Sequence, residues 1–407
     1  MKLPLVILLA CCSLVACSTR MQETQSANEL PTRAEVIGSL FTGAEQDINF
    51  NRMAELFPVS TMTAASESAP FPAGIAAALP ESYDYDGKAR SVEDFLNDTD
   101  TAALLVVQQG KIRYEQYWRT GGPEVQWLSM SVAKSFTSAA LGIAVHEGLI
   151  GSIEDPADLY LPWLKGSAYD GVRIKDILQM SSGTLWNEDY SDPEADVFKL
   201  GAIMAAGGSL QEMIKTLKRE RDPGTFNQYN STDTQVLGLL LRQVTGRSVA
   251  DYMEEKLWHP LGMESNGYWM TDDEGAEMTF GGLNATARDY AKLGQLYLQN
   301  GNWQGRQIVP SDWVKASVTP DAPHLQPGEN PLSDYVMGYG YQWWIPEGKD
   351  GEFSAIGVYN QFIYVHPPSQ TVIVKLSANS NYGMTDDESS WRELETMALF
   401  RSIVRHL

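Results

Sequence analysis

Strand-like sequence occurs in two distant parts of this 407-residue chain, near residue 102 and again near residue 360. The first part, TAALLVVQQGKIRYEQYW, is typical of two strands joined by a turn at Gly110. The second part holds two runs, YNQFIYVHP and QTVIVKLSA, with a proline-rich turn between them. Helical patterns broken by proline and glycine fill residues 155–275, where strand signals are sparse. We therefore expect a mixed α/β (α+β) fold whose sheet combines both ends of the chain around an inserted helical segment.

These patterns divide the chain into four parts. Residues 1–16 have the composition of an export signal. Residues 17–75, rich in Ser, Thr, Ala, Glu and Pro, are interpreted as a tether followed by a segment that packs on the main body. Residues 76–160 and 276–407 are predicted to form an α/β domain, and residues 161–275 an all-helical domain inserted into it.

The first twenty residues, MKLPLVILLACCSLVACSTR, contain a short apolar run, residues 3–16, that cannot span a bilayer. LVAC, ending at Cys17, resembles the bacterial lipoprotein signal, in which the cysteine after the cleavage site carries the lipid. LLAC, ending at Cys11, fits the same pattern with a shorter apolar run, and a plain signal peptide or a membrane anchor is the alternative. Ser18 resembles the signal for outer-membrane retention. We expect a protein of the bacterial cell envelope, held in the outer membrane by its N-terminal lipid and facing the periplasm.

Composition argues against several classes of function. The only cysteines are Cys11, Cys12 and Cys17, so cleavage before Cys17 would leave no disulfide, no cysteine nucleophile and no cysteine-based zinc site. The five histidines show no paired spacing and no HExxH motif, which predicts no metal site, and nothing in the sequence calls for a cofactor. A net charge of −22 repels nucleic acid and anionic lipid headgroups, so we expect no nucleic-acid partner.

A serine and a lysine lie three residues apart in LSMSVAKSFTSAALGIAVHEG, residues 128–148. The apolar spacing predicts a helix that ends near Gly148, with Ser129 as a plausible N-cap and Ser131 in the first turn. Ser131 and Lys134 would then share one face, where a desolvated lysine can take the proton of a serine hydroxyl. About one such pair is expected by chance in a chain of this composition. A surface lysine on a capped helix therefore stays open as the alternative.

Two further stretches carry groups suited to the same chemistry. Tyr229-Asn230-Ser231 precedes a helical run, and a tyrosine phenol can relay a proton if a nearby cation lowers its pKa. Gly357, in EFSAIGVYNQFIYVHP, marks a place where a strand approaches a ligand or another backbone closely. A buried tyrosine beside a helix N-cap and an ordinary edge strand are the alternatives.

Taken together, the three stretches resemble the serine β-lactamase and penicillin-binding-protein superfamily. Ser-x-x-Lys on a helix, then Tyr-x-Ser/Asn, then a strand that ends in Gly follow the order of its motifs. The resemblance covers roughly residues 80–400. WNEDYSDPEADV and FSAIGVYNQ look most like the branch of the aminohexanoate-oligomer (nylon-oligomer) hydrolases and related esterases. The resemblance to this superfamily implies a β-lactamase-like fold, with an antiparallel sheet flanked by helices and an inserted helical domain.

The resemblance also implies roles for individual residues. Ser131 would be the nucleophile, Lys134 its activating base and Tyr229 the proton relay. Ser231 would support Lys134 by a hydrogen bond. The backbone N–H groups of Ser131 and Val358 would form the oxyanion hole.

Substrate-binding residues are implied less directly. Tyr190 matches a substrate-contacting tyrosine of the oligomer hydrolases, Trp186 lies close to it in sequence, and Ala355 and Gly357 belong to the strand motif. Three further aromatic residues are candidates for the wall of the cleft: Tyr341, Trp343 and Trp344. Each could equally be a core aromatic. The strand motif departs from the family pattern, because Ala355-Ile356-Gly357 lacks the cation and the hydroxyl that help to hold a β-lactam carboxylate.

We therefore expect a serine hydrolase that cleaves amide or ester bonds of a small molecule through an acyl-enzyme. Two alternatives remain at this stage. One is a β-lactamase or a D-Ala-D-Ala peptidase, and the other is a non-catalytic cell-envelope lipoprotein on the same fold. A Ser-His-Asp enzyme is disfavoured, because no G-x-S-x-G motif occurs.

Overall fold

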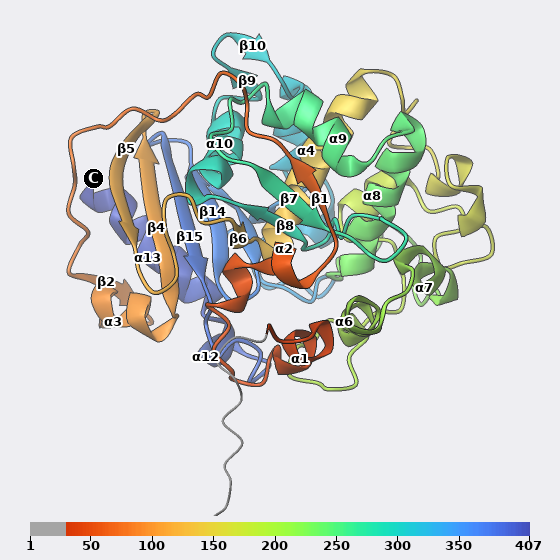
Figure 1. Cartoon of the computed structure of the whole chain (residues 1–407), viewed down its shortest axis with the longest axis horizontal. Coiled ribbons are helices and arrows are strands. Elements are labelled where there is room, and N and C mark those ends of the chain that lie inside the picture. Colours follow the sequence, from red (N-terminus) through yellow and green to blue (C-terminus); the bar gives the residue numbers. More distant parts are fainter. Residues whose placement is uncertain (1–29) are drawn as a thin grey trace, which may run out of the picture. The chain divides into compact units, whose positions relative to one another are not determined.

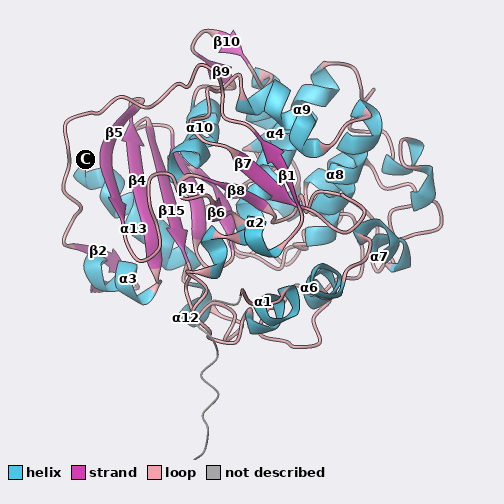
Figure 2. Ribbon diagram, viewed as in Figure 1, coloured by secondary structure: helices cyan, strands magenta, loops and turns pink. Residues whose placement is uncertain are grey.

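The computed structural model describes residues 30–407, and its largest sheet joins two distant parts of the chain (Figures 1 and 2). The strands are β1 (Val59–Met62), β2 (Ser82–Tyr85), β3 (Lys88–Ser91), β4 (Thr101–Gln108), β5 (Lys111–Tyr117), β6 (Trp127–Leu128), β7 (Gly267–Met270), β8 (Leu283–Ala285), β9 (Asn302–Trp303), β10 (Arg306–Gln307), β11 (Gly338–Tyr339), β12 (Trp344–Ile345), β13 (Phe353–Gly357), β14 (Gln361–His366) and β15 (Thr371–Ser377). The predicted signal peptide and Cys17 lie outside the described residues.

The main sheet is antiparallel, with strand order β11-β12-β13-β14-β15-β4-β5. One of its inner strands is β15, which is mostly β-branched and aliphatic and is buried along its length between β14 and β4. The turn between β4 and β5 lies at Gly110, where the sequence predicts it, and has left-handed backbone at Gln109 and Gly110. The expectation of one sheet built from both ends of the chain is confirmed.

The helices are α1 (Arg33–Ser39), α2 (Met53–Leu56), α3 (Val92–Asp98), α4 (Ala133–His146), α5 (Ile174–Leu178), α6 (Val197–Ala206), α7 (Leu210–Thr216), α8 (Ser231–Thr245), α9 (Val249–Met253), α10 (Ala287–Leu298), α11 (Ser311–Ser317), α12 (Glu388–Trp391) and α13 (Glu393–His406). Helix α10 packs on β14, β15 and β4 from one side of the main sheet. Helix α13 covers the other side, where Phe400 meets Phe362 and Tyr364 (Figure 1). Two hydrophobic cores lie on the two faces of the main sheet, and apolar side chains along each buried strand alternate between them.

A second antiparallel sheet, β1-β7-β8-β6, lies between the main sheet and the helices α8 and α9 in the view of Figure 2. It includes β1, which comes from the predicted N-terminal segment and pairs with β7. It also corrects the expectation that residues 161–275 are all helical, because the buried sequence GYWM forms β7. This segment forms a strand because its aromatic residues, Tyr268 and Trp269, favour strands and because β7 pairs with β1 on one side and β8 on the other.

Residues 32–407 form one compact unit, so the predicted α/β and helical segments are parts of a single body. Helix α4, from the first segment, is buried over almost its whole length and packs against α8 of the second. The starts of these two helices carry the two predicted motifs, so this packing brings residues 131 and 231 together.

Candidate active site

Ser131 lies in a short 3₁₀ turn, Met130–Val132, that leads directly into α4. The sequence predicts Ser129 as the N-cap of this helix, and the structure differs, since the Ser129 hydroxyl instead donates to the carbonyl oxygen of Met130. Met130 has left-handed backbone, with φ of 45°, a conformation that is uncommon for a non-glycine residue. The chain therefore turns sharply before Ser131, whose side chain lines a cavity.

Lys134 is almost fully buried and its amine lies beside the predicted nucleophile. Its Nζ is 2.9 Å from Ser131 Oγ, 3.1 Å from Ser231 Oγ and 2.7 Å from the carbonyl oxygen of Phe280. Burial lowers the pKa of Lys134 to about 7, and the negative charge of Glu188 opposes this shift. Lys134 is therefore a largely neutral amine above that pH, and a neutral amine at this distance can accept the hydroxyl proton of Ser131.

Tyr229 comes just before α8, whose first turn is capped by the Asn230 side chain. Its ring stacks on Trp344 at 5.1 Å, and the Lys134 Nζ lies 4.9 Å from the ring centroid. The condition named for a proton relay, a phenol pKa lowered by a nearby cation, is not met at Tyr229. Burial and the nearby Tyr339 and Glu188 raise the pKa of Tyr229 well above its usual value, although a hydrogen-bonding contact with Ser131 opposes the shift. Tyr229 therefore stays protonated at neutral pH, the form in which it can act as a hydrogen-bond and proton donor.

Glu188 is a member of this site that the sequence interpretation missed. Its buried carboxylate accepts hydrogen bonds from the Ser231 N–H at 2.7 Å, the Trp186 indole at 2.6 Å and the Tyr190 phenol at 2.9 Å. The hydroxyl of Ser231 also donates to it. In a chain with 52 acidic residues a single glutamate gives no signal, and only its position between Trp186 and Tyr190 could have indicated a role.

The strand β13 approaches the turn at Ser131 so closely that only glycine fits at its end. A Cβ atom on Gly357 would lie 2.6 Å from the carbonyl oxygen of Ser129 and 2.9 Å from the backbone nitrogen of Ser131. The strand lies between β12 and β14, so it is not the edge strand that the sequence left open. Val358, which follows Gly357, lines the cavity beside Ser131.

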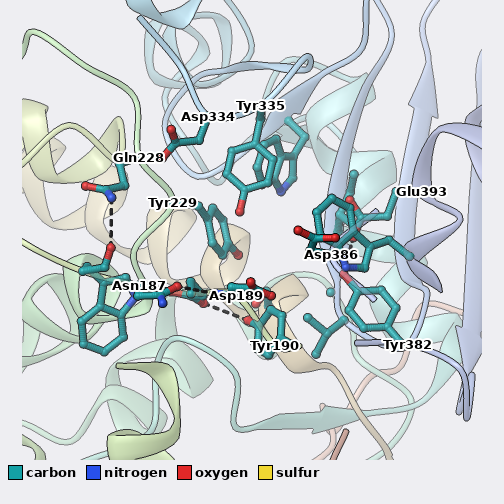
Figure 3. A pocket seen from close by; sticks show the side chains of 18 residues that line it. Asn187, Asp189, Tyr190, Gln228, Tyr229, Asp334, Tyr335, Tyr382, Asp386 and Glu393 are labelled. Atoms are coloured by element: carbon teal, nitrogen blue, oxygen red, sulfur yellow. Dashed lines mark hydrogen bonds between the residues drawn. The ribbon is translucent and has the colours of Figure 1, made fainter. Parts of the chain in front are cut away.

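A cavity of about 610 Å³ opens in front of these groups (Figure 3). Of the residues predicted to bind substrate, Trp186, Tyr190 and Gly357 line it, as does Trp344. Ala355 does not, because strand alternation turns its side chain into the main core, and Ile356 lines the cavity instead. Two of the candidate wall residues, Tyr341 and Trp343, are likewise buried away from it.

The cavity wall is acidic. Its carboxylates come from four separate places in the chain and are Glu188, Asp189, Asp334, Asp386 and Glu393. Arginine, lysine and histidine are absent from the residues that line it within the described part of the chain. Tyr229, Tyr335 and Tyr382 point toward the same space, and the Tyr382 phenol donates to Glu393 (Figure 3). Such a wall attracts a cationic group and repels a carboxylate.

The N-terminal segment supports this wall from behind. The ring of Phe41 packs on Tyr190 at 4.5 Å and stacks on Tyr359 at 5.1 Å, and its backbone N–H donates to the Tyr359 phenol. Gly383 packs tightly between Phe41 and Tyr190. A Cβ atom on Gly383 would lie 2.7 Å from Cδ1 of Phe41 and 3.0 Å from Cβ of Tyr190. The segment that follows the predicted tether is therefore part of the framework that holds Tyr190.

Within residues 30–407 no group of three or more His, Cys, Asp or Glu side chains is arranged to hold a metal ion. In the same range, no helix combines the length and apolar character needed to cross a membrane.

Comparison with known proteins decides the family. The Beta-lactamase family model matches residues 89–397, which is most of the chain. The chain belongs to the Beta-lactamase family. Membership confirms the predicted β-lactamase-like fold and makes the chain a serine hydrolase, the class to which its relatives belong.

Two of the relatives within the Beta-lactamase family carry the name of one branch. The 6-aminohexanoate-dimer hydrolase of Paenarthrobacter ureafaciens is 30% identical over 342 residues, which cover 81% of this chain and 84% of that protein. A solved structure from Bacillus anthracis, described as a candidate 6-aminohexanoate-dimer hydrolase, superimposes with a TM-score of 0.79 at 27% identity, covering 88% of this chain and 94% of that one. EstCE1, a hydrolase with promiscuous acyltransferase activity, shares the fold with a TM-score of 0.61 at 16% identity, covering 77% and 96% of the two chains. The resemblance to the aminohexanoate-oligomer hydrolases is thereby confirmed.

Proposed function

We propose that this chain hydrolyses linear amide or ester bonds through an acyl-enzyme formed on Ser131. The observation that carries the proposal is the 2.9 Å contact between Ser131 Oγ and the amine of buried Lys134, at the floor of a cavity large enough for a small linear substrate. A serine hydroxyl becomes a nucleophile when a base takes its proton, and burial lowers the pKa of this amine to about 7, so that it is largely neutral above that pH.

The reaction follows from this arrangement in two halves. Lys134 accepts the proton of Ser131 as Ser131 Oγ attacks the substrate carbonyl. The N–H groups of Ser131 and Val358 then stabilise the oxyanion, and the close approach of Gly357 to Ser131 supports this pairing. Tyr229, which is protonated at the start, donates its proton to the leaving group and later takes one from the water that attacks the acyl group. Lys134 returns its proton to Ser131 as the acyl group is released.

The substrate class is inferred from the charge of the cavity. Five acidic residues line the cavity without a lining cation. Burial raises the pKa of Glu393 to about 7 and also raises that of Asp334, so the wall favours a substrate that carries an ammonium group most strongly above that pH. At the strand position where the family usually has a hydroxyl, Ile356 presents an apolar side chain, which leaves a β-lactam carboxylate without its partner. The named relative acts on a dimer of 6-aminohexanoate, a linear amide with an amine at one end and a carboxylate at the other. We therefore propose short linear amides or esters that end in an amine as substrates.

Three anilides that differ at one end test this proposal. We expect 6-aminohexanoyl p-nitroanilide to be hydrolysed with a kcat/KM about 10-fold above that of its N-acetyl derivative, because one favourable charge contact contributes roughly 1.4 kcal/mol. The N-succinyl derivative, which ends in a carboxylate, should be slower again. The readout is the release of p-nitroaniline at pH 8, with Ser131→Ala as the inactive control.

Two results would contradict separate parts of the proposal. Equal rates for the three anilides would overturn the ammonium preference and leave the serine hydrolase standing. Absence of hydrolysis of all three, together with rapid turnover of a chromogenic cephalosporin, would overturn the proposed function in favour of a β-lactamase.

We also propose that the chain is a lipoprotein of the bacterial outer membrane that faces the periplasm, attached through Cys17. The support is the sequence LVAC before Ser18. Fractionation of cells that express the full chain tests it, since Cys17→Ser should move the protein from the membrane to the soluble fraction. Equal membrane association of both forms would contradict the lipid anchor.

A further inference from the structure

The hydrogen bonds around Lys134 leave one arrangement of its protons. A neutral amine has two N–H donors and one lone pair, and the Nζ of Lys134 has three close oxygen neighbours. The carbonyl oxygen of Phe280 can only accept, so it takes one N–H. The Ser231 hydroxyl gives its own proton to Glu188, so it also accepts from Lys134. The lone pair must then face Ser131, which is the direction in which a base is needed.

Glu188 is the group that fixes this arrangement. Its carboxylate is an acceptor only, and every contact it makes is from a donor: the Ser231 hydroxyl and N–H, the Trp186 indole and the Tyr190 phenol. If Glu188 did not hold the hydroxyl proton of Ser231, that hydroxyl could turn and donate to Lys134. The lone pair would then be occupied and unable to accept from Ser131.

We propose that Glu188 is a positioning residue for catalysis, which acts through Ser231 to direct the lone pair of Lys134 toward Ser131 and supplies the negative charge that stabilises the ammonium formed on Lys134. The inference rests on the proposed function. The charges balance, since the proton of Ser131 moves to Lys134 while Ser231 keeps its proton and Glu188 remains a carboxylate. The two buried groups become an ion pair bridged by one hydroxyl during the reaction.

Other titratable groups around this pair come from three segments and do not replace Glu188. Tyr190 belongs to the same loop, Tyr229 and Asp233 to the start of α8, and Tyr335 and Tyr339 to the segment before β12. Burial raises the pKa of each tyrosine above its usual value, which keeps the tyrosines neutral, and it raises the pKa of Asp233 to about 7, so that Asp233 is neutral only below that pH. Glu188 alone among them is the charge that raises the pKa of Lys134 against the effect of burial.

The test is the pH dependence of labelling by a fluorophosphonate probe, which reports the reactivity of Ser131 in the free enzyme. In the wild type, labelling should fall as the pH drops through about 7, because Lys134 becomes protonated. Glu188→Gln should slow labelling about 100-fold at its optimum. The same variant should move the acid limb to lower pH, because removing the negative charge lowers the pKa of Lys134 further. A merely structural role would reduce the rate without moving this limb.

Glu194→Gln is the matched control, because it removes a carboxylate from an exposed position of the same loop. It should leave both the rate and the acid limb unchanged. If near-UV circular dichroism shows that Glu188→Gln does not fold, Ser231→Ala tests the same chain of contacts and should also slow labelling about 100-fold. A folded Glu188→Gln protein that is labelled at the wild-type rate, with the wild-type acid limb, would overturn the role of Glu188 and leave the proposed function standing. The same result for Ser231→Ala would do so if Glu188→Gln does not fold. A wild type that is not labelled at any pH would overturn the proposed function as well.

Discussion

Replacing Lys134 by methionine should reduce hydrolysis about 10⁴-fold while leaving the fold intact. Methionine has nearly the same length and fits a buried site, but it has no lone pair that can take the proton of Ser131. The loss should appear in kcat and in kcat/KM alike, because Lys134 acts on the nucleophile and does not line the cavity. Steady-state hydrolysis of a chromogenic ester and the melting temperature of the same sample measure the two effects.

Lys315→Met is the control for this variant, since Lys315 lies on the exposed side of α11, outside the residues that line the cavity. It should keep wild-type activity. A Lys134→Met protein that retains more than a tenth of wild-type activity with an unchanged melting temperature would show that another group removes the proton of Ser131.

Replacing Gly357 by alanine should reduce activity about 100-fold and stability by about 1–3 kcal/mol. The added Cβ would meet the carbonyl oxygen of Ser129 and the backbone nitrogen of Ser131, and backbone atoms cannot move aside as a flexible side chain can. The strand or the turn must shift, and a shift of a few tenths of an ångström at Ser131 disturbs both the nucleophile and the proposed oxyanion site. Chemical denaturation and ester hydrolysis measure the two losses.

Gly38→Ala is the matched comparison, because Gly38 lies in helix α1 and an added Cβ atom there would meet no other atom within 4 Å. Alanine favours helix over glycine, so this variant should be as stable as the wild type or slightly more so, with unchanged activity. Wild-type activity and stability in Gly357→Ala would mean that β13 and the turn at Ser131 are not held as closely as the structure places them.

The sequence was most informative where function and local pattern coincide. The turn at Gly110 and the apolar runs of β14 and β15 follow from neighbouring residues and were predicted close to where they lie. The order of Ser131, Tyr229 and Gly357 along the chain was enough to predict that they meet, because a family pattern links them. Each of the three lines the cavity.

What the sequence left out depends on contacts between distant segments. Glu188 is one of many acidic residues until the packing of α8 places Ser231 against it. Phe41 precedes Tyr359 by more than 300 residues, so no local pattern links it to the cavity wall. Ala355 was assigned to the cavity from its place in the motif, whereas the alternation of β13 puts Ile356 there.

The central claim is that Ser131 becomes acylated during turnover, and the most direct measurement is the mass of the enzyme quenched in acid while it hydrolyses a slow ester. We expect the wild type to gain the mass of the acyl group, on the proteolytic peptide that contains Ser131, and Ser131→Ala to gain none. An active wild type that carries no acyl group when quenched before steady state, or carries it on another residue, would contradict the account.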